Sequence, residues 1–427
     1  MNRGRRALLA AVLAAPVAWI AAKKPRRHGG AHDDYFLALQ AALRKAGLFR
    51  PTLVIDRQKL AHNLARLKTK LPKNKKFRVV AKSLPSLPLV AEVRRAMGTD
   101  RLMVFHQPHL NLIAAQMPDA QMLLGKPMPA GAARRFFEDH RRNAFDAPRQ
   151  IEWLVDTPQR IAEYRDLASA SGRLRLNLEL DVGLHRGGFR TAQEVVEAIR
   201  AIRAAPTLEF SGFMGYEAHA AKIPDALGGV HGALASAMAF YGECVAAARE
   251  TLGAAFDAER LTLNAGGSNT YAYYDEAAPC NELAIGSGLV KPTDFDTPGL
   301  AEHVPASFIA TPVLKALNTT QIPGLESLTG AFRAWDPNTA RTFYVYGGYW
   351  LANAVSPPGL QRNDIWGHST NQDMLNGSAD VQLGVGDFVF FRPHQSEFVF
   401  LQFGDLAVYD EGRIVESWPV FPESAGA

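Results

Sequence analysis

The sequence predicts a (β/α)8 barrel followed by an all-β domain, with a hydrophobic segment at the N-terminus. Short apolar runs of strand length alternate with helical stretches eight times over about 200 residues, which is typical of such a barrel. From about residue 293 helical periodicity nearly vanishes, while strand-like runs separated by Gly, Pro and Asn continue. An open doubly wound sheet is the rival, but no Gly-rich dinucleotide loop follows the first strand.

The barrel elements follow one another in a regular order. A helix is expected at 33–47, a short strand at 51–55, and a helix capped by Asp56 that runs to about 71. The eight barrel strands are expected at 77–81, 101–105, 121–125, 151–155, 174–181, 210–216, 261–264 and 282–286. The helices between them are expected at 87–97, 130–141, 157–169, 192–204 and 232–252.

The last part of the chain contains strand-like runs. We expect strands at 307–314, 342–346, 387–391, 398–403 and 406–410. The predicted organisation therefore has three parts: a hydrophobic anchor or signal segment with a basic linker (1–30), a barrel with an N-terminal helix (31–292), and a β domain (293–427).

Composition and charge restrict the classes of protein that fit this chain. Its 427 residues are 47% hydrophobic and 21% charged, which is typical of a globular protein. Seven Lys and Arg residues lie within 1–30, and without them the net charge of +5 becomes −2. We therefore expect no nucleic-acid partner. Cys244 and Cys280 are too few for a disulfide framework or a zinc knuckle.

Residues 7–22 form an uncharged apolar run with basic residues on both sides. The run is shorter than the roughly 20 residues that cross a bilayer, and Pro16 interrupts it. A signal peptide, a twin-arginine signal and an uncleaved anchor all fit this pattern. Because the basic residues after the run oppose translocation, we expect association with the inner membrane, with the side left open. Export to the periplasm is the alternative.

Chemically distinctive residues follow the predicted barrel strands, where the functional side chains of such barrels gather. Lys82 lies at the end of the first strand, before a Pro-containing turn, which places its amine at the barrel mouth. Asp181 and Arg186 follow the fifth strand, and Tyr216 and His219 follow the sixth. A solvated lysine, a surface arginine, a core tyrosine and a structural histidine are the simpler alternatives.

The loops after the last two strands are rich in Gly and Ser. They contain Gly266, Gly267 and Ser268 after strand seven, and Gly286 and Ser287 after strand eight. Backbone N–H groups and hydroxyls in such loops suit a phosphate, although plain tight turns are the alternative. A lysine and a phosphate cradle at one barrel mouth fit pyridoxal phosphate, which carries an aldehyde and a phosphate.

Five segments resemble one known family. They are PTLVID (51–56), VVAKS (79–83), ELDVGLHRGG (179–188), NAGGSNT (264–270) and GDFVFFRPH (386–394). Over roughly residues 50–415 the chain is similar to the alanine-racemase-type (fold type III) pyridoxal phosphate enzymes, and within them to D-threonine aldolase and D-serine dehydratase. The resemblance implies a (β/α)8 barrel, a pyridoxal phosphate cofactor, a small amino-acid substrate and a homodimer.

The resemblance also implies roles for individual residues. Lys82 matches the lysine that forms the Schiff base with the cofactor, and Arg186 matches an arginine beside the cofactor ring. Tyr216 matches a tyrosine near the cofactor that is available for proton transfer, and His219 is a further candidate acid or base. The phosphate-binding turns are matched by Gly266, Gly267, Ser268, Gly286 and Ser287.

The segment that holds a divalent metal in this branch is altered here. In the family a histidine is followed two positions later by cysteine or aspartate, whereas His394 is followed by Gln395 and Ser396. A serine hydroxyl is a poor ligand beside a thiolate or carboxylate. Glu397 could supply the charge, but in a strand over 394–400 it would face away from His394. His394 is the predicted ligand, and whether a metal binds stays open.

The sequence therefore predicts a pyridoxal phosphate-dependent lyase. We expect an aldolase or a dehydratase/deaminase that acts on a small D-amino acid such as D-threonine or D-serine. A racemase of the same fold is the alternative, because the metal segment is altered, and a non-catalytic pyridoxal phosphate-binding protein is another. A barrel hydrolase fits less well, because no pair of glutamates stands at the strand ends.

Overall fold

The computed structural model describes residues 23–140, 144–321, 324–363 and 367–422. The chain divides into two compact units. The sheet unit comprises Met1–Val54, Phe308–Pro393 and Tyr409–Val415, and the barrel unit comprises Ile55–Ser307, His394–Val408 and Glu416–Ala427. Among the described residues no helix is both long and apolar enough to cross a membrane. The predicted hydrophobic segment at 7–22 lies outside the described residues.

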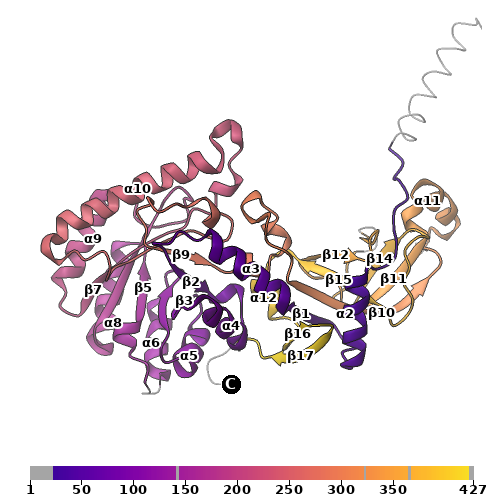
Figure 1. Cartoon of the computed structure of the whole chain (residues 1–427), viewed down its shortest axis with the longest axis horizontal. Helices are drawn as coiled ribbons and strands as arrows, with labels where there is room; N and C mark the ends of the chain where they lie inside the picture. The colour runs from indigo at the N-terminus through magenta and orange to yellow at the C-terminus, as the bar shows by residue number, and fades with distance from the viewer. Residues whose placement is uncertain (1–22, 141–143, 322–323, 364–366, 423–427) are drawn as a thin grey trace, which may run out of the picture. The chain divides into compact units, whose positions relative to one another are not determined.

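Within the described part of the barrel unit, eight parallel strands close into a barrel in the order of the sequence (Figure 1). The strands are β2 (Lys76–Val80), β3 (Arg101–Val104), β4 (Gln121–Leu124), β5 (Ile151–Val155), β6 (Leu174–Leu180), β7 (Leu208–Gly215), β8 (Thr262–Ala265) and β9 (Glu282–Ile285). All eight predicted barrel strands are confirmed, with ends that move by at most two residues.

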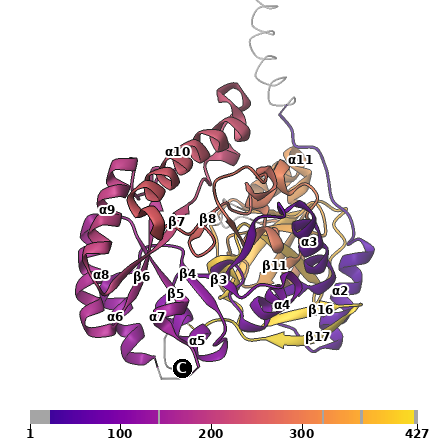
Figure 2. The same cartoon turned by 60° about the vertical axis from the view of Figure 1, so that its left-hand side comes forward.

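Helices surround the barrel strands on the outside (Figures 1 and 2). They are α3 (Arg57–Lys70), α4 (Leu87–Met97), α5 (Gln107–Gln116), α6 (Ala130–Asp139), α7 (Ala147–Gln150), α8 (Pro158–Ser171), α9 (Ala192–Ala204) and α10 (Gly229–Leu252). Local sequence starts several of them: Asp56 accepts a hydrogen bond from Lys59 N, and Thr191 with Glu194 forms a capping box. Helices α5 and α7 are short and were not predicted.

A buried ion pair ties β2 to β9 inside the barrel. Arg78 Nε lies 2.5 Å from Glu282 Oε1, and both side chains are almost completely buried. Arg101 also contacts this carboxylate, with its Nη1 at 2.8 Å from Glu282 Oε2. Burial by itself raises the pKa of Glu282, but Arg78 and Arg101 outweigh it and the pKa lies below its usual value. The carboxylate therefore stays charged and links the strands near their N-terminal ends.

The sheet unit carries most of a second sheet, which has nine strands among the described residues. They are β1 (Thr52–Asp56), β10 (Ser307–Leu317), β11 (Arg341–Tyr346), β12 (Ala352–Ser356), β13 (Gln361–Arg362), β14 (Gln372–Gly377), β15 (Phe388–Pro393), β16 (Leu406–Asp410) and β17 (Arg413–Trp418). Helices α2 (Asp34–Lys45) and α11 (Thr329–Trp335) belong to this unit too, so it is not all-β.

Two predictions about this part of the chain are wrong. The boundaries at 30/31 and 292/293 differ from the structure, because α2 and most of β1 belong to the sheet unit and 394–408 belongs to the barrel unit. The segment 398–403 is not a strand: it overlaps the short helix α12 (Glu397–Phe400), in which Phe400 N donates to Ser396 O. A short apolar run without alternation is compatible with either structure, so periodicity could not decide.

Candidate active site

A cavity of about 600 Å³ lies at the carboxyl ends of the barrel strands. It is lined by residues in or directly after β2, β3, β4, β7, β8 and β9, by residues of the loop after β6, and by residues of segments 294–295 and 395–397. The predicted catalytic and cofactor residues that line it are Lys82, Arg186, Tyr216, His219, Gly266, Gly267, Ser268, Gly286 and Ser287. The barrel thus brings together, at one mouth, residues that are up to about 200 positions apart in the sequence.

Lys82 does not extend freely into solvent. It lies in a 3-10 turn, η1 (Ala81–Ser83), directly after β2. Its Nζ lies 2.5 Å from Glu397 Oε1 and 4.7 Å from the centroid of the Phe105 ring. The Lys82 and Glu397 side chains are 31% and 33% exposed. The Glu397 carboxylate and the Phe105 ring therefore hold the Lys82 amine at the edge of the cavity, where it can react with a bound ligand.

The turn that carries Lys82 touches the turn after β9. Strand pairing places Val79 in β2 beside Ile285 in β9, so the segments that follow these two strands leave the barrel side by side. Ser287 Oγ then donates to Ser83 Oγ at 3.0 Å and lies 3.1 Å from the hydroxyl of Ser396, which is fully buried. The lysine and this proposed phosphate turn are therefore neighbours.

The turns after β8 and β9 are joined by one hydroxyl. Ser268 Oγ accepts from Gly286 N at 3.3 Å and from Gly288 N at 2.9 Å. A Cβ at Gly267 would lie 2.8 Å from Cε2 of Tyr216, which is closer than real Cβ atoms come. A larger residue at this position would therefore push the Tyr216 ring away from the turn. Serine hydroxyls and a glycine-lined surface beside a lysine fit a ligand that has an aldehyde and a phosphate.

Arg186 and Tyr216 form a second pair at the cavity. The guanidinium carbon of Arg186 lies 5.3 Å from the centroid of the Tyr216 ring, a cation–π contact. Desolvation by the surrounding protein raises the pKa of the Tyr216 phenol, although 36% of the residue is exposed. The phenol therefore stays protonated at neutral pH and can donate a proton into the cavity.

A buried carboxyl group supports the turn after β8. Glu217 is fully buried and accepts from Thr270 Oγ1 at 2.5 Å and from Gly266 N at 3.3 Å. Thr270 Oγ1 in turn accepts from Gly267 N at 3.0 Å. Burial raises the pKa of Glu217, which favours the neutral carboxyl. The sequence analysis missed Glu217, although its position directly after the sixth strand is the signal that could have found it.

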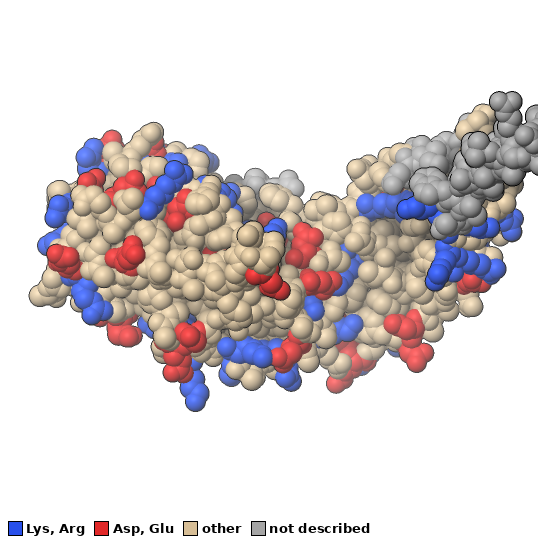
Figure 3. All heavy atoms as spheres, turned by 90° about the horizontal axis from the view of Figure 1, so that it is seen from above, with Lys and Arg blue, Asp and Glu red and all other residues tan. Residues whose placement is uncertain are grey.

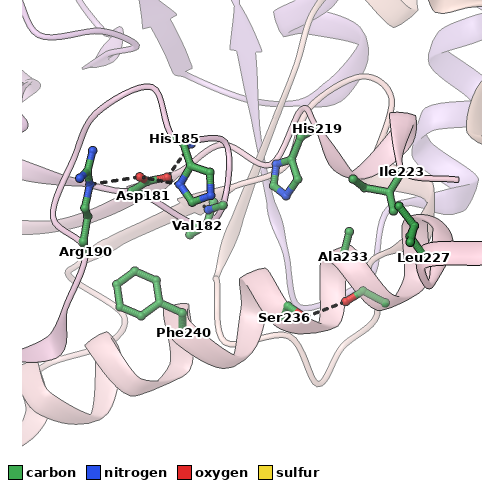
Figure 4. Close-up of a pocket in the computed structure, with 12 residues that line it drawn as sticks. Asp181, Val182, His185, Arg190, His219, Ile223, Leu227, Ala233, Ser236 and Phe240 are labelled. Carbon is green, nitrogen blue, oxygen red and sulfur yellow. Dashed lines mark hydrogen bonds and ion pairs between the residues drawn. The ribbon is translucent and has the colours of Figure 1, made fainter.

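His219 lines both the main cavity and a second cavity of about 570 Å³. Figure 4 shows it among the residues that line the second cavity. The second cavity contains a buried carboxylate: Asp181 Oδ2 lies 3.2 Å from His185 Nδ1 and 3.4 Å from Arg190 Nε. Burial lowers the pKa of His219, so its imidazole is neutral at neutral pH and can accept a proton. Gly183, with φ of +107°, permits this arrangement, since a Cβ would lie 3.0 Å from His219 Nε2.

The predicted metal segment lies partly at the cavity. His394 does not line the cavity, whereas Gln395 and Glu397 do. The described residues contain no group of three or more His, Cys, Asp or Glu side chains arranged to hold a metal ion. The expectation that Glu397 faces away rested on a strand over 394–400, which is wrong. The helical turn of α12 instead lets the Glu397 carboxylate contact Lys82.

Several cavity residues were not found from the sequence. Phe105 follows β3, so the strand-end rule could have found it. Asp294, Gln395 and Glu397 lie outside the barrel strands, and no pattern in the sequence places them near Lys82.

Comparisons with known proteins identify a family for the barrel part of the chain. The family model described as the alanine racemase N-terminal domain matches residues 55–294. An alanine racemase of Levilactobacillus brevis is 30% identical over 179 residues, which is 41% of this chain and 46% of that protein. A 3-hydroxy-D-aspartate aldolase of Paracoccus denitrificans is 32% identical over 145 residues, 33% of this chain and 35% of that protein. The matches thus span less than half of each relative.

Solved structures share the fold over most of the chain. A D-threonine aldolase from Filomicrobium marinum matches with a TM-score of 0.68 at 18% identity, over 87% of this chain and 94% of that one. A D-threo-3-hydroxyaspartate dehydratase from Delftia sp. HT23 matches with a TM-score of 0.65 at 16% identity, over 87% and 97%. An alanine racemase from Bacillus anthracis matches with a TM-score of 0.63 at 14% identity, over 87% and 98%.

Proposed function

Because the chain belongs to the alanine racemase N-terminal domain family, we propose that it is a pyridoxal phosphate-dependent lyase. Its substrate in this proposal is a small D-amino acid of the D-threonine or D-serine type. The observation that carries the proposal is that the Lys82 amine and the Gly/Ser turns after β8 and β9 line one cavity.

The residues at the cavity fit this cofactor. Lys82 would hold its aldehyde carbon, and the hydroxyls of Ser268 and Ser287 would hold its phosphate. When bound, pyridoxal phosphate supplies an electron sink for bonds at the substrate Cα. Arg186, which already lies over the Tyr216 ring, would place a positive charge beside the cofactor.

The chain's own residues supply the proton transfers. The Tyr216 phenol is protonated and can donate, and the His219 imidazole is neutral and can accept. Both side chains line the cavity that contains Lys82. Lyase chemistry is supported by the match with a D-threonine aldolase over nearly its whole chain. Racemase chemistry is the second candidate, since an alanine racemase is 30% identical over part of the chain.

Absorbance and product analysis test the proposal. The purified protein with pyridoxal phosphate should be yellow, and borohydride reduction should leave the cofactor attached to the peptide that contains Lys82. Lys82→Ala should lose the visible absorbance, whereas Lys222→Ala, which changes another lysine at the same cavity, should keep it. A colourless wild type that takes up no cofactor contradicts the proposal.

Products separate the reaction types. An aldolase releases glycine and acetaldehyde from D-threonine, and a dehydratase releases pyruvate and ammonia from D-serine. A racemase converts D-alanine to L-alanine with neither product. Turnover of none of the three amino acids by the yellow protein would contradict the lyase and racemase proposals together.

A further inference from the structure

Two carboxylates lie on one wall of the main cavity. Asp294 belongs to the 3-10 turn η7 (Thr293–Phe295), and Glu397 begins α12. The two segments are joined: Asp294 N donates to His394 O at 3.1 Å, and Gln395 Nε2 donates to Asp294 Oδ2 at 3.1 Å. We call Asp294 and Glu397 the acidic wall.

The acidic wall has a single cationic partner. Among the ion pairs of the described residues, Glu397 pairs with Lys82 alone and Asp294 pairs with no Lys, Arg or His. The other cations at the cavity are Arg186 and Lys222, which come from the loops after β6 and β7. On the face of the barrel unit that Figure 3 shows, positive and negative side chains are interspersed, so the outer surface supplies no strong opposing field there.

Cofactor binding removes that partner. This step rests on the proposed function: in the loaded protein, before any substrate reacts, the Lys82 nitrogen is committed to the cofactor, so an arriving ligand meets Glu397 without the ammonium that now lies at 2.5 Å. A partly buried carboxylate then needs a hydrogen-bond donor or a cation from the substrate. A side-chain hydroxyl supplies an O–H donor, whereas a side-chain carboxylate supplies only negative charge.

We propose that the acidic wall selects amino acids that carry a hydroxyl or another hydrogen-bond donor on the side chain and excludes those with a side-chain carboxylate. Asp294 and Glu397 are therefore specificity-determining residues. The 3-hydroxy-D-aspartate aldolase that the chain matches is named for a substrate with a second carboxylate. In this chain the acidic wall would repel the second carboxylate of such a substrate, so the two proteins would accept different classes of amino acid.

Binding of two amine-free ligands to the cofactor-loaded protein tests the proposal directly. Calorimetry with 3-hydroxybutyrate, which has one carboxylate and one hydroxyl, and with malate, which has two carboxylates, reports the selectivity without turnover. We expect the wild type to bind 3-hydroxybutyrate at least about tenfold more tightly than malate, because one like-charge contact in a partly buried site costs that much or more. Rates with D-threonine and D-3-hydroxyaspartate should show the same order.

Charge-removing variants assign the effect. Glu397→Gln and Asp294→Asn each keep the shape of the side chain. Glu397→Gln should reduce the ratio of the two dissociation constants about tenfold, and Asp294→Asn should reduce it less, because Asp294 is exposed and water screens its charge. Asp166→Asn is the matched control, because it removes an exposed carboxylate on α8 that does not line the cavity. Its ratio should equal that of the wild type. Thermal unfolding and visible absorbance confirm that each variant is folded and loaded.

The outcomes are distinct. A wild type that takes up no pyridoxal phosphate overturns the proposed function and the acidic wall together. A loaded wild type that binds malate as tightly as 3-hydroxybutyrate overturns the acidic wall alone. So does an unchanged ratio in both wall variants when at least one of them is folded and loaded.

Discussion

Replacement of Gly286 by alanine should separate β9 from β2 at the proposed phosphate site. Gly286 is the residue after β9, and a Cβ there would lie 2.8 Å from Val80 Cβ, 2.8 Å from Ser83 Cβ and 2.9 Å from Val80 O. Those atoms belong to or adjoin the backbone, so no flexible side chain can move aside. The turn after β9 must therefore move away from β2, and the hydrogen bond from Ser287 to Ser83 lengthens or breaks.

The size of the effect follows from these contacts. Overpacking of a buried site costs typically about 1–3 kcal/mol, and loss of one buried hydrogen bond adds about 1 kcal/mol. We expect Gly286→Ala to lower the free energy of unfolding by about 2–4 kcal/mol. We also expect it to weaken cofactor binding by at least about tenfold, because the N–H groups of this turn would move relative to Ser268.

Urea unfolding followed by circular dichroism, and titration with pyridoxal phosphate, measure the two effects. Gly131→Ala is the matched control, because a Cβ at Gly131 in α6 meets nothing within 4 Å. It should leave cofactor binding unchanged and alter stability by no more than about 1 kcal/mol. The reasoning is refuted if the free energy of unfolding of Gly286→Ala lies within about 0.5 kcal/mol of the wild-type value and the variant binds the cofactor equally tightly.

Other variants test the barrel and the site. Arg78→Ala leaves the buried carboxylate of Glu282 without its closest cation. We therefore expect the free energy of unfolding in urea to fall by about 3–5 kcal/mol, and an unchanged urea midpoint would contradict this. Burial raises the pKa of Glu179 to about 7, above its value in the unfolded chain, so the native state should lose stability as pH rises from about 4.5 to 7. Glu179→Gln should flatten that dependence, and an identical pH profile would exclude this carboxyl as its source. Ser268→Ala removes the acceptor that joins two turns and should weaken cofactor binding about tenfold without loss of the visible absorbance at saturation; an unchanged affinity would exclude a role in the cradle. Metal analysis of the wild type and His394→Ala decides the metal prediction: a metal content that His394→Ala lowers supports it, and equal content in both excludes His394 as a ligand.

The barrel was predictable from the sequence because its strands are local features. Each of β2–β9 is a short apolar run bounded by turn residues, and in a parallel barrel both faces are covered, so every strand shows the same continuous pattern. The positions of Lys82, Arg186, Tyr216 and the two glycine-rich turns at the barrel mouth were predictable too, since each lies in the loop that follows one of these runs. Their placement at one cavity is observed, and their chemical roles stay predictions, as do the homodimer and the membrane association.

The contact between Lys82 and Glu397 was not predictable from local sequence patterns. No local pattern distinguished α12 from a strand, and that single error reversed the expected direction of Glu397. The division into units was also missed, because a segment near residue 400 joins the barrel unit while α2 joins the sheet unit. Such long-range placement depends on how separate elements bury their apolar surfaces together.

The sequence by itself determined the number and order of the barrel strands, and with them which side chains stand at the barrel mouth. Hydrophobic patterning and turn residues are local, and closure of a parallel sheet then leaves little freedom in where each strand ends. Only the tertiary structure decided which carboxylate contacts Lys82 and that a second carboxylate, Asp294, lies on the same wall. Those contacts join segments about 100 to 300 residues apart, and packing of whole elements, rather than any short run of residues, brings them within a few ångströms.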